Sequence, residues 1–181
     1  REFVATLLKA MHTGRVITQD NFTIEFRPTA AFSDMTVPAC DTVMSPNAEQ
    51  SNTTVVADQA CVIKIFRKVN EGIHPEIEIG RFLLENTTYK NVPDLLGSAE
   101  LIENGRHSAL AVVHRFVGNQ GDAWSVTAAH LGRFIDDQRG TTAEAPEANH
   151  ELASYLQRIR QIGLRTGELQ TAFASRASGL R

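Results

Sequence analysis

The sequence predicts an α+β fold in which an antiparallel sheet is followed mainly by helices. Three observations support this class. Residues 60–66 form an apolar, strand-patterned run that contains a single lysine. Asn104-Gly105 joins two strand-like runs, 94–103 and 108–116, and Asn-Gly is a typical turn of a tight hairpin. Residues 150–175 instead repeat apolar side chains every three or four positions, which predicts one long amphipathic helix.

The first 47 residues carry one helix signal and one strand signal. Residues 1–12 repeat apolar side chains at helical spacing, so we expect a short amphipathic helix. Residues 21–26 alternate polar and apolar side chains, which predicts a strand. Residues 27–47 contain three prolines and only short apolar pieces, and this indicates a connector leading into a new sheet.

Local signals also bound the next elements. Residues 53–56 predict a strand that pairs with 60–66 through a turn at Asp58-Gln59. Pro75 is expected to begin a helix that runs to about Asn86, because a proline at the first helical position loses no hydrogen bond.

The sequence period changes after residue 116. Trp124 to Ile135 predicts a helix with Asp122 as its N-cap, and Trp124 is expected in the core. Residues 136–149 are polar and contain a proline, so we expect a loop before the long helix.

Composition excludes several classes of protein. The chain has 181 residues, of which 42% are hydrophobic and 22% charged, as in ordinary proteins that bury a core. A net charge of −3 gives no general attraction to nucleic acid or to an anionic membrane. No apolar run approaches the roughly 20 residues that span a bilayer. Without a secretory signal, a cytoplasmic location is the default expectation.

The two cysteines and the first residue carry further information. Cys40 and Cys61 show no CxxC or Cys/His ligand spacing, so we expect reduced, partly buried thiols rather than a disulfide or a metal site. The chain starts at Arg1 inside a helical pattern. We therefore expect a piece of a longer polypeptide, with trimming of a disordered start as the alternative.

Lys64 is the most informative residue. A lysine within a strand-patterned apolar run is costly unless an anion meets it. Two partners fit, namely a carboxylate from the helix that carries Glu76 and Glu78, or a nucleotide phosphate. The alternative is a lysine on an edge strand with its amine in water.

Four blocks of sequence carry a family resemblance: residues 49–54, 62–67, 74–83 and 116–124. Together they closely resemble the maltokinases, including the maltokinase region fused to bacterial trehalose synthases. The resemblance runs from near residue 1 to about residue 175.

The resemblance implies an enzyme that makes maltose 1-phosphate from maltose and ATP. It also implies a kinase-like small lobe with an antiparallel sheet and one helix. That lobe and its hinge would occupy residues 41–117, after an α+β cap subdomain at 1–40. The first helices of a large lobe would follow at 118–181.

The same resemblance assigns roles to residues. Ser51, Asn52 and Thr53 would cover the ATP phosphates, whereas spacing alone favours a polar hairpin turn. Lys64 would contact the phosphates and pair with Glu78, which leaves Glu76 as a solvated residue of the first helical turn.

Backbone groups of the hinge, at Val113, Phe116 and Val117, would meet the adenine. Kinases also need a catalytic aspartate and Mg²⁺ ligands. No histidine here precedes Gly-Asp or Arg-Asp, and there is no Asp-Phe-Gly motif. We therefore expect those residues beyond position 181, no catalytic or metal-binding residue within this chain, and no turnover by the chain alone.

Two other functions stay open at this level. One is a non-catalytic interaction module that docks to a trehalose synthase domain. The other is a kinase of a different small molecule, such as an aminoglycoside or choline type. The sugar and the oligomeric state are not readable from the sequence.

Overall fold

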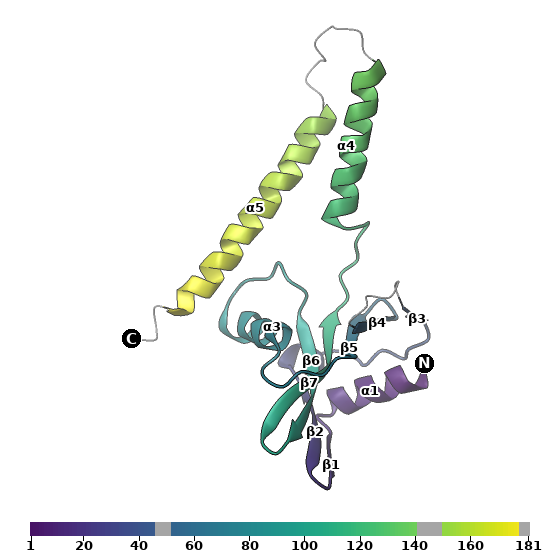
Figure 1. Cartoon of the computed structure of the whole chain (residues 1–181), viewed down its shortest axis with the longest axis vertical. Helices are drawn as coiled ribbons and strands as arrows, with labels where there is room; N and C mark the ends of the chain where they lie inside the picture. Colours follow the sequence, from purple (N-terminus) through teal and green to yellow (C-terminus); the bar gives the residue numbers. More distant parts are fainter. Residues whose placement is uncertain (46–51, 141–149, 178–181) are drawn as a thin grey trace. The chain divides into compact units, whose positions relative to one another are not determined.

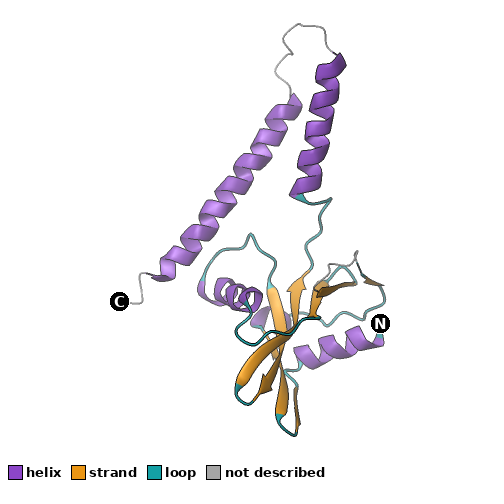
Figure 2. Cartoon of the chain, viewed as in Figure 1, coloured by secondary structure: helices purple, strands orange, loops and turns teal. Residues whose placement is uncertain are grey.

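The computed structural model describes residues 1–45, 52–140 and 150–177. Within these residues it contains seven strands in one antiparallel sheet and five helices, a mixed α/β arrangement (Figures 1 and 2). Contacts divide the chain into two compact units, Arg1–Val117 and Gly118–Arg181. The sheet lies entirely in the first unit.

The sheet has the strand order β1-β2-β6-β7-β5-β4-β3, and every neighbouring pair is antiparallel. Its strands are β1 (Val16–Gln19), β2 (Phe22–Pro28), β3 (Val43–Met44), β4 (Asn52–Ala57), β5 (Cys61–Phe66), β6 (Leu95–Glu103) and β7 (Arg106–Arg115).

Two tight turns confirm the predicted hairpins. Asp58 and Gln59 join β4 to β5 with φ angles of 49° and 51°. Asn104 and Gly105 join β6 to β7 with φ angles of 51° and 77°. Positive φ at both central residues matches the twist of antiparallel strands.

Helices cover both faces of the sheet. α1 (Glu2–His12) and α2 (Ala30–Ser33) pack on one face, where Leu8, Met11 and Phe32 are fully buried. α3 (Pro75–Asn86) packs on the other face through Ile77. Successive residues of a strand point to opposite faces. Accordingly, Val113 belongs to the first cluster and its neighbour Val112 to the second.

The N-terminal segment shares this sheet and core. β2 pairs with β6 from Phe22↔Glu103 to Pro28↔Gly97. α1 comes so close to β6 that a Cβ on Gly97 would lie 2.8 Å from Met11 Sδ and 2.9 Å from the Arg27 carbonyl oxygen. A side chain at this position would have to displace either the helix or the strand.

Most predicted elements of the first unit are confirmed, and α3 has the predicted bounds. The connector 27–47 holds more structure than expected. It contains the end of β2, the short α2 and β3. β1 was not predicted because its four residues are all exposed and carry no buried alternation. Both cysteines are free and buried.

The second unit consists of α4 (Ala123–Gly140) and α5 (His150–Ala177). Asp122 caps α4 as predicted, because its Oδ1 accepts the Ser125 backbone N–H at 2.6 Å. α4 continues past the predicted end at Ile135, while residues 141–149 of the expected loop lie outside the described part. Trp124 is 81% exposed, so the prediction that it lies in the core is wrong.

No helix in the described part of the chain is both long enough and apolar enough to cross a membrane.

Candidate nucleotide site

The centre of the candidate site is an ion pair between the sheet and α3. Lys64 on β5 places its Nζ 3.1 Å from Glu76 Oε2 and 3.5 Å from Oε1. Their side chains are 30% and 29% exposed, so both are partly withdrawn from water. The predicted need of Lys64 for an anionic partner is therefore met within the chain.

A third group completes this cluster. His114 on β7 places its Nε2 3.1 Å from Glu76 Oε1. The register pairs Lys64 with Val112 and Val62 with His114, so lysine and histidine lie diagonally on one face of adjacent strands. We define Lys64, Glu76 and His114 as the Glu76 cluster.

The electrostatics of the cluster keep the carboxylate ionised. The pKa of Glu76 is lowered to about 2, first by the hydrogen bond from His114 and then by the hydrogen bond and positive charge of Lys64. Partial burial opposes this shift. Position within α3 adds to the effect, because an acidic side chain in the first helical turn meets the positive end of the helix dipole.

The expected pairing of Lys64 with Glu78 is wrong in this structure. Pro75 is the first residue of α3 and His74 its N-cap, and the His74 Nδ1 accepts the Glu76 backbone N–H at 3.3 Å. This start directs Glu76 toward Lys64, whereas Glu78 is exposed and lines a pocket that does not include Lys64. The sequence pattern places both glutamates beside the buried face of the helix. It does not show how the helix is rotated about its axis, and that rotation decides which glutamate faces Lys64.

Two of the three predicted phosphate-covering residues lie on β4. Ser51 is outside the described residues. Asn52 and Thr53 begin β4, and the register pairs Thr53 with Ile65 and Thr54 with Lys64. Directly opposed residues share a face. Alternation therefore places Asn52 and Thr54 on the face of Lys64, and Thr53 on the opposite face.

The predicted hinge residues occupy the end of the first unit. Val113 is fully buried in β7, opposite Ile63. The Phe116 backbone N–H donates to the Ala60 carbonyl at 3.0 Å, so the sheet already uses this donor. Val117 is 53% exposed and is the last residue of the unit.

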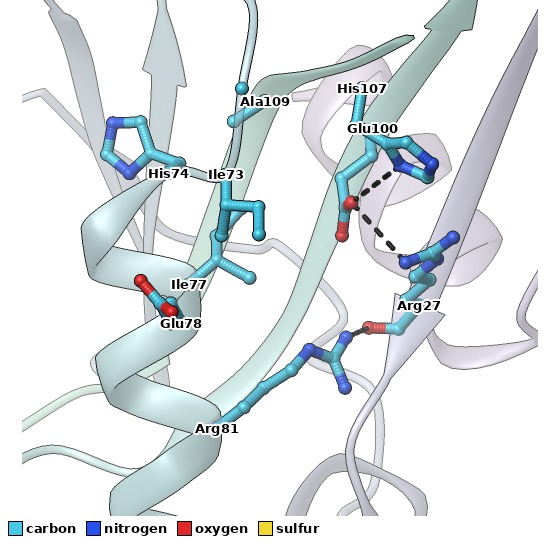
Figure 3. A pocket seen from close by; sticks show the side chains of 10 residues that line it. Arg27, Ile73, His74, Ile77, Glu78, Arg81, Glu100, His107 and Ala109 are labelled. Atoms are coloured by element: carbon cyan, nitrogen blue, oxygen red, sulfur yellow. Dashed lines mark hydrogen bonds and ion pairs between the residues drawn. The ribbon is translucent and has the colours of Figure 1, made fainter. Parts of the chain in front are cut away.

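A separate pocket of about 400 Å³ lies between α3 and the sheet (Figure 3). Glu78 and Arg81 contribute from α3, Glu100 and His107 from the β6–β7 hairpin, and Arg27 from β2. Ile73, Ile77 and Ala109 supply apolar lining. Neither Lys64 nor His114 lines it, so the pocket is distinct from the Glu76 cluster.

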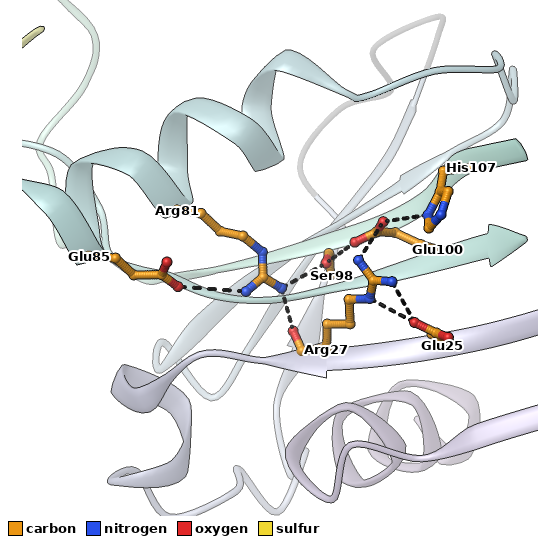
Figure 4. Close-up of polar contacts among 7 residues, drawn as sticks. All are labelled: Glu25, Arg27, Arg81, Glu85, Ser98, Glu100 and His107. Atoms are coloured by element: carbon orange, nitrogen blue, oxygen red, sulfur yellow. Dashed lines mark hydrogen bonds and ion pairs between the residues drawn. The ribbon is translucent and has the colours of Figure 1, made fainter. Parts of the chain in front are cut away.

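A polar network beside this pocket ties α3 to the N-terminal strands (Figure 4). Arg27 binds Glu25 at 2.6 Å and Glu100 at 3.4 Å. Arg81 of α3 donates to the Arg27 carbonyl at 3.1 Å and to Ser98 at 3.3 Å. These bonds engage both guanidinium groups with protein partners, and we assign the network a structural role in seating α3.

The described residues show no metal centre. Among residues 1–45, 52–140 and 150–177, no three His, Cys, Asp or Glu side chains lie close enough to hold a metal ion. Glu76 has both carboxylate oxygens on protein donors.

A strand lysine held by a helix glutamate is the pair that orients ATP phosphates in protein kinases. Comparison with solved structures shows what the fold resembles. It is similar to the fold of glucosamine kinase in complex with glucosamine, ADP and inorganic phosphate, with a TM-score of 0.60 and 16% identity. Two further glucosamine kinase structures match with TM-scores of 0.60 and 0.51 at 15% and 16% identity.

These matches cover 96%, 95% and 97% of this chain, but only 36%, 35% and 50% of the respective glucosamine kinase chains. The chain thus spans about a third to a half of the proteins it resembles. No protein-family model matches the sequence.

Sequence reasoning missed His114 and Thr54. Each becomes part of the site only through strand register, since His114 lies 50 positions from Lys64 along the chain. The only usable signal was alternation along β7, which places residues 112 and 114 on one face.

Proposed function

We propose that this chain is the ATP-binding part of a sugar phosphotransferase of the maltokinase type, which converts ATP and maltose into maltose 1-phosphate. The observation that carries the proposal is the 3.1 Å ion pair between Lys64 and Glu76 on a sugar-kinase-like fold. The maltokinase assignment adds the four sequence blocks at 49–54, 62–67, 74–83 and 116–124.

In this proposal Lys64 contacts the α- and β-phosphates of ATP. A lysine ammonium has three donors, and within the described part of the chain only Glu76 lies within hydrogen-bonding distance of it. Donors therefore remain for a phosphate, while Glu76 fixes the direction of the amine. Partial exclusion of water strengthens the attraction between the amine and a phosphate oxygen.

Other nucleotide contacts follow from the same assignment. Ser51 and Asn52 cover the terminal phosphates. Thr53 contributes backbone groups, because its side chain lies on the face opposite Lys64. Backbone groups of Val113, Phe116 and Val117 form the hinge beside the adenine. The Phe116 N–H is already bonded to Ala60, so its carbonyl is the group left for the base. Residues 1–40 form a cap that shares the sheet and core of the small lobe, and 118–181 begin the large lobe.

The proposal gives this chain nucleotide binding without phosphoryl transfer. Transfer requires an aspartate near the acceptor hydroxyl and Mg²⁺ to neutralise developing charge. The 181 residues contain no His-Gly-Asp, His-Arg-Asp or Asp-Phe-Gly sequence, and the described residues hold no metal-binding cluster. We therefore assign neither the base nor the metal ligands to this chain.

Calorimetric titration with ATP tests the proposal. We expect the chain to bind ATP and Lys64→Met to weaken binding at least tenfold, because a charge-assisted contact contributes about 1.5–3 kcal/mol. Lys9→Met is the matched control, since Lys9 is an exposed lysine on α1, across the sheet from Lys64. No binding by the chain, or equal losses in the two variants, would contradict a nucleotide site at Lys64.

A second candidate acceptor is an amino sugar, favoured by the glucosamine kinase structures that share the fold. ADP formation from ATP by a polypeptide that joins this chain to the catalytic residues, measured with maltose and with glucosamine, distinguishes the two acceptors. Turnover of glucosamine but not maltose would replace the maltokinase assignment and leave the nucleotide site unchanged.

A further inference from the structure

The carboxylate of Glu76 is divided between two strands. Oε2 faces Lys64 Nζ on β5 at 3.1 Å, while Oε1 faces His114 Nε2 on β7 at 3.1 Å. Each oxygen thus has its own closest donor. Because the two donors come from adjacent strands, the carboxylate can rotate only by breaking one of these bonds.

The second ring nitrogen defines the chemical form of His114. Its Nδ1 is buried and has no hydrogen-bond partner in the described part of the chain. A hydrogen on Nδ1 would be a buried donor without an acceptor, which is costly. The hydrogen-bond geometry therefore assigns the neutral tautomer with its hydrogen on Nε2, which donates to Glu76.

A neutral donor suits this position electrostatically. Lys64 on β5 supplies one positive charge and Glu76 on α3 one negative charge. The other titratable group beside them, His74, uses Nδ1 to accept the Glu76 backbone N–H. His114 thus holds Glu76 through a hydrogen bond, while Lys64 supplies the ionic contact.

We propose that His114 is a positioning residue of the nucleotide site, which holds Glu76 from β7 and so determines which helix glutamate orients Lys64. The contact between His114 and Glu76 is independent of the proposed function, whereas its effect on ATP binding rests on that function. The consequence is that removal of His114 frees Glu76 to turn toward water or to move its Oε1, now 3.5 Å from Lys64 Nζ, closer to the amine. Either change redirects the amine away from the phosphate.

His114 also explains why Glu76 and not Glu78 forms the pair. Both glutamates lie in the first turn of α3, and both could gain from the helix dipole. Only Glu76 finds a second donor on the sheet, whereas Glu78 is exposed at the separate pocket. The start of α3 directs Glu76 toward the sheet, and His114 then holds it beside Lys64.

Nuclear magnetic resonance on the whole chain tests the contact without nucleotide. We expect the His114 ring to carry its hydrogen on Nε2 at neutral pH. We expect the carboxyl titration of Glu76 to move upward by about one pH unit in His114→Leu, the change that corresponds to one hydrogen bond. His114→Gln, which retains an N–H donor, should restore most of the difference. A hydrogen on Nδ1, or an unchanged Glu76 titration in His114→Leu, would overturn the proposal.

ATP titration tests the consequence. His114→Leu should bind ATP about tenfold more weakly than the unaltered chain, and His114→Gln within about threefold of it. In a Lys64→Met background, His114→Leu should cause no further loss, because its effect passes through the lysine. Equal losses with and without Lys64 would show a merely structural role and refute positioning.

The two arms separate the two proposals. If the unaltered chain binds no ATP, the nucleotide assignment fails, while the Glu76 titration and the His114 tautomer still decide whether His114 holds Glu76. If His114→Leu does not fold, His114→Gln and the tautomer measurement on the unaltered chain decide it instead.

Discussion

The acid sensitivity of the first unit should depend on Glu76. Its pKa lies at about 2 instead of 4.5, mainly through the hydrogen bond from His114 and the interaction with Lys64. A shift of one pKa unit corresponds to about 1.4 kcal/mol, so the shift implies at most about 3.5 kcal/mol of stability. Because the side chain is 29% exposed, solvent screening lowers our expectation to about 1–2 kcal/mol.

The sign follows from the direction of the shift. A carboxyl whose folded-state pKa is lowered stabilises the folded state above its unfolded-state pKa, and this contribution is lost as the pH falls through the folded-state value. Glu76→Gln should therefore destabilise the unit by about 1–2 kcal/mol at pH 7. The difference should shrink as the pH falls from about 4.5 to about 2, because protonated glutamate and glutamine are close to isosteric.

Urea titration followed by amide resonances of β5 and β7 measures this difference for the first unit alone. Trp124, the single tryptophan, lies in the second unit and reports on that unit by fluorescence. Glu78→Gln is the matched control, since Glu78 is exposed two positions further along α3. A pH-independent loss in Glu76→Gln, or an equal loss in Glu78→Gln, would refute the assignment.

Three further outcomes are expected. Asp58→Ala should lower the urea midpoint, because the Asp58 carboxylate accepts two backbone N–H groups of the connector at 2.7 Å each. Asp58→Asn should lower the midpoint less, because its amide oxygen can still accept one of these hydrogen bonds. Gly97→Ala should destabilise by about 1–3 kcal/mol through its clash with Met11. Gly163→Ala is the control, because Gly163 lies in a helix with open space around it, and this change should stabilise the chain by up to about 1 kcal/mol. Similar effects of the two glycine substitutions would contradict the close approach of α1 to β6. The Cys61 thiol should react with a disulfide reagent only on unfolding, because burial raises its pKa to about 12; rapid reaction in the folded chain would disagree.

Elements with local chemical signals were predictable from the sequence. Asn104-Gly105 fixes its hairpin because few residues tolerate positive φ at both turn positions. Pro75 marks the start of α3 because proline fits the first helical position. α4, in contrast, continues beyond its apolar pattern to Gly140, through a stretch where Arg139 and Asp136 form an i,i+3 ion pair at 3.9 Å.

The site was predictable only in part. Lys64 stood out because its charge conflicts with the surrounding apolar pattern. Its partner did not, because Glu76 and Glu78 have the same side chain and flank the same buried arc. The choice depends on how α3 is rotated and on His114, a residue that strand pairing brings near from a distant part of the chain. Such information is absent from local sequence patterns.

The pairing of β2 with β6 has a consequence for how this chain can be shortened. A variant that began after residue 40 would lack β1 and β2, and the nine-residue strand β6 would become an uncovered sheet edge. Unpaired edges of that length recruit strands from other molecules, which leads to aggregation. β1, a four-residue strand with every residue exposed, is a poor template for such recruitment. The N-terminal hairpin therefore covers an edge that would otherwise be open to strand addition.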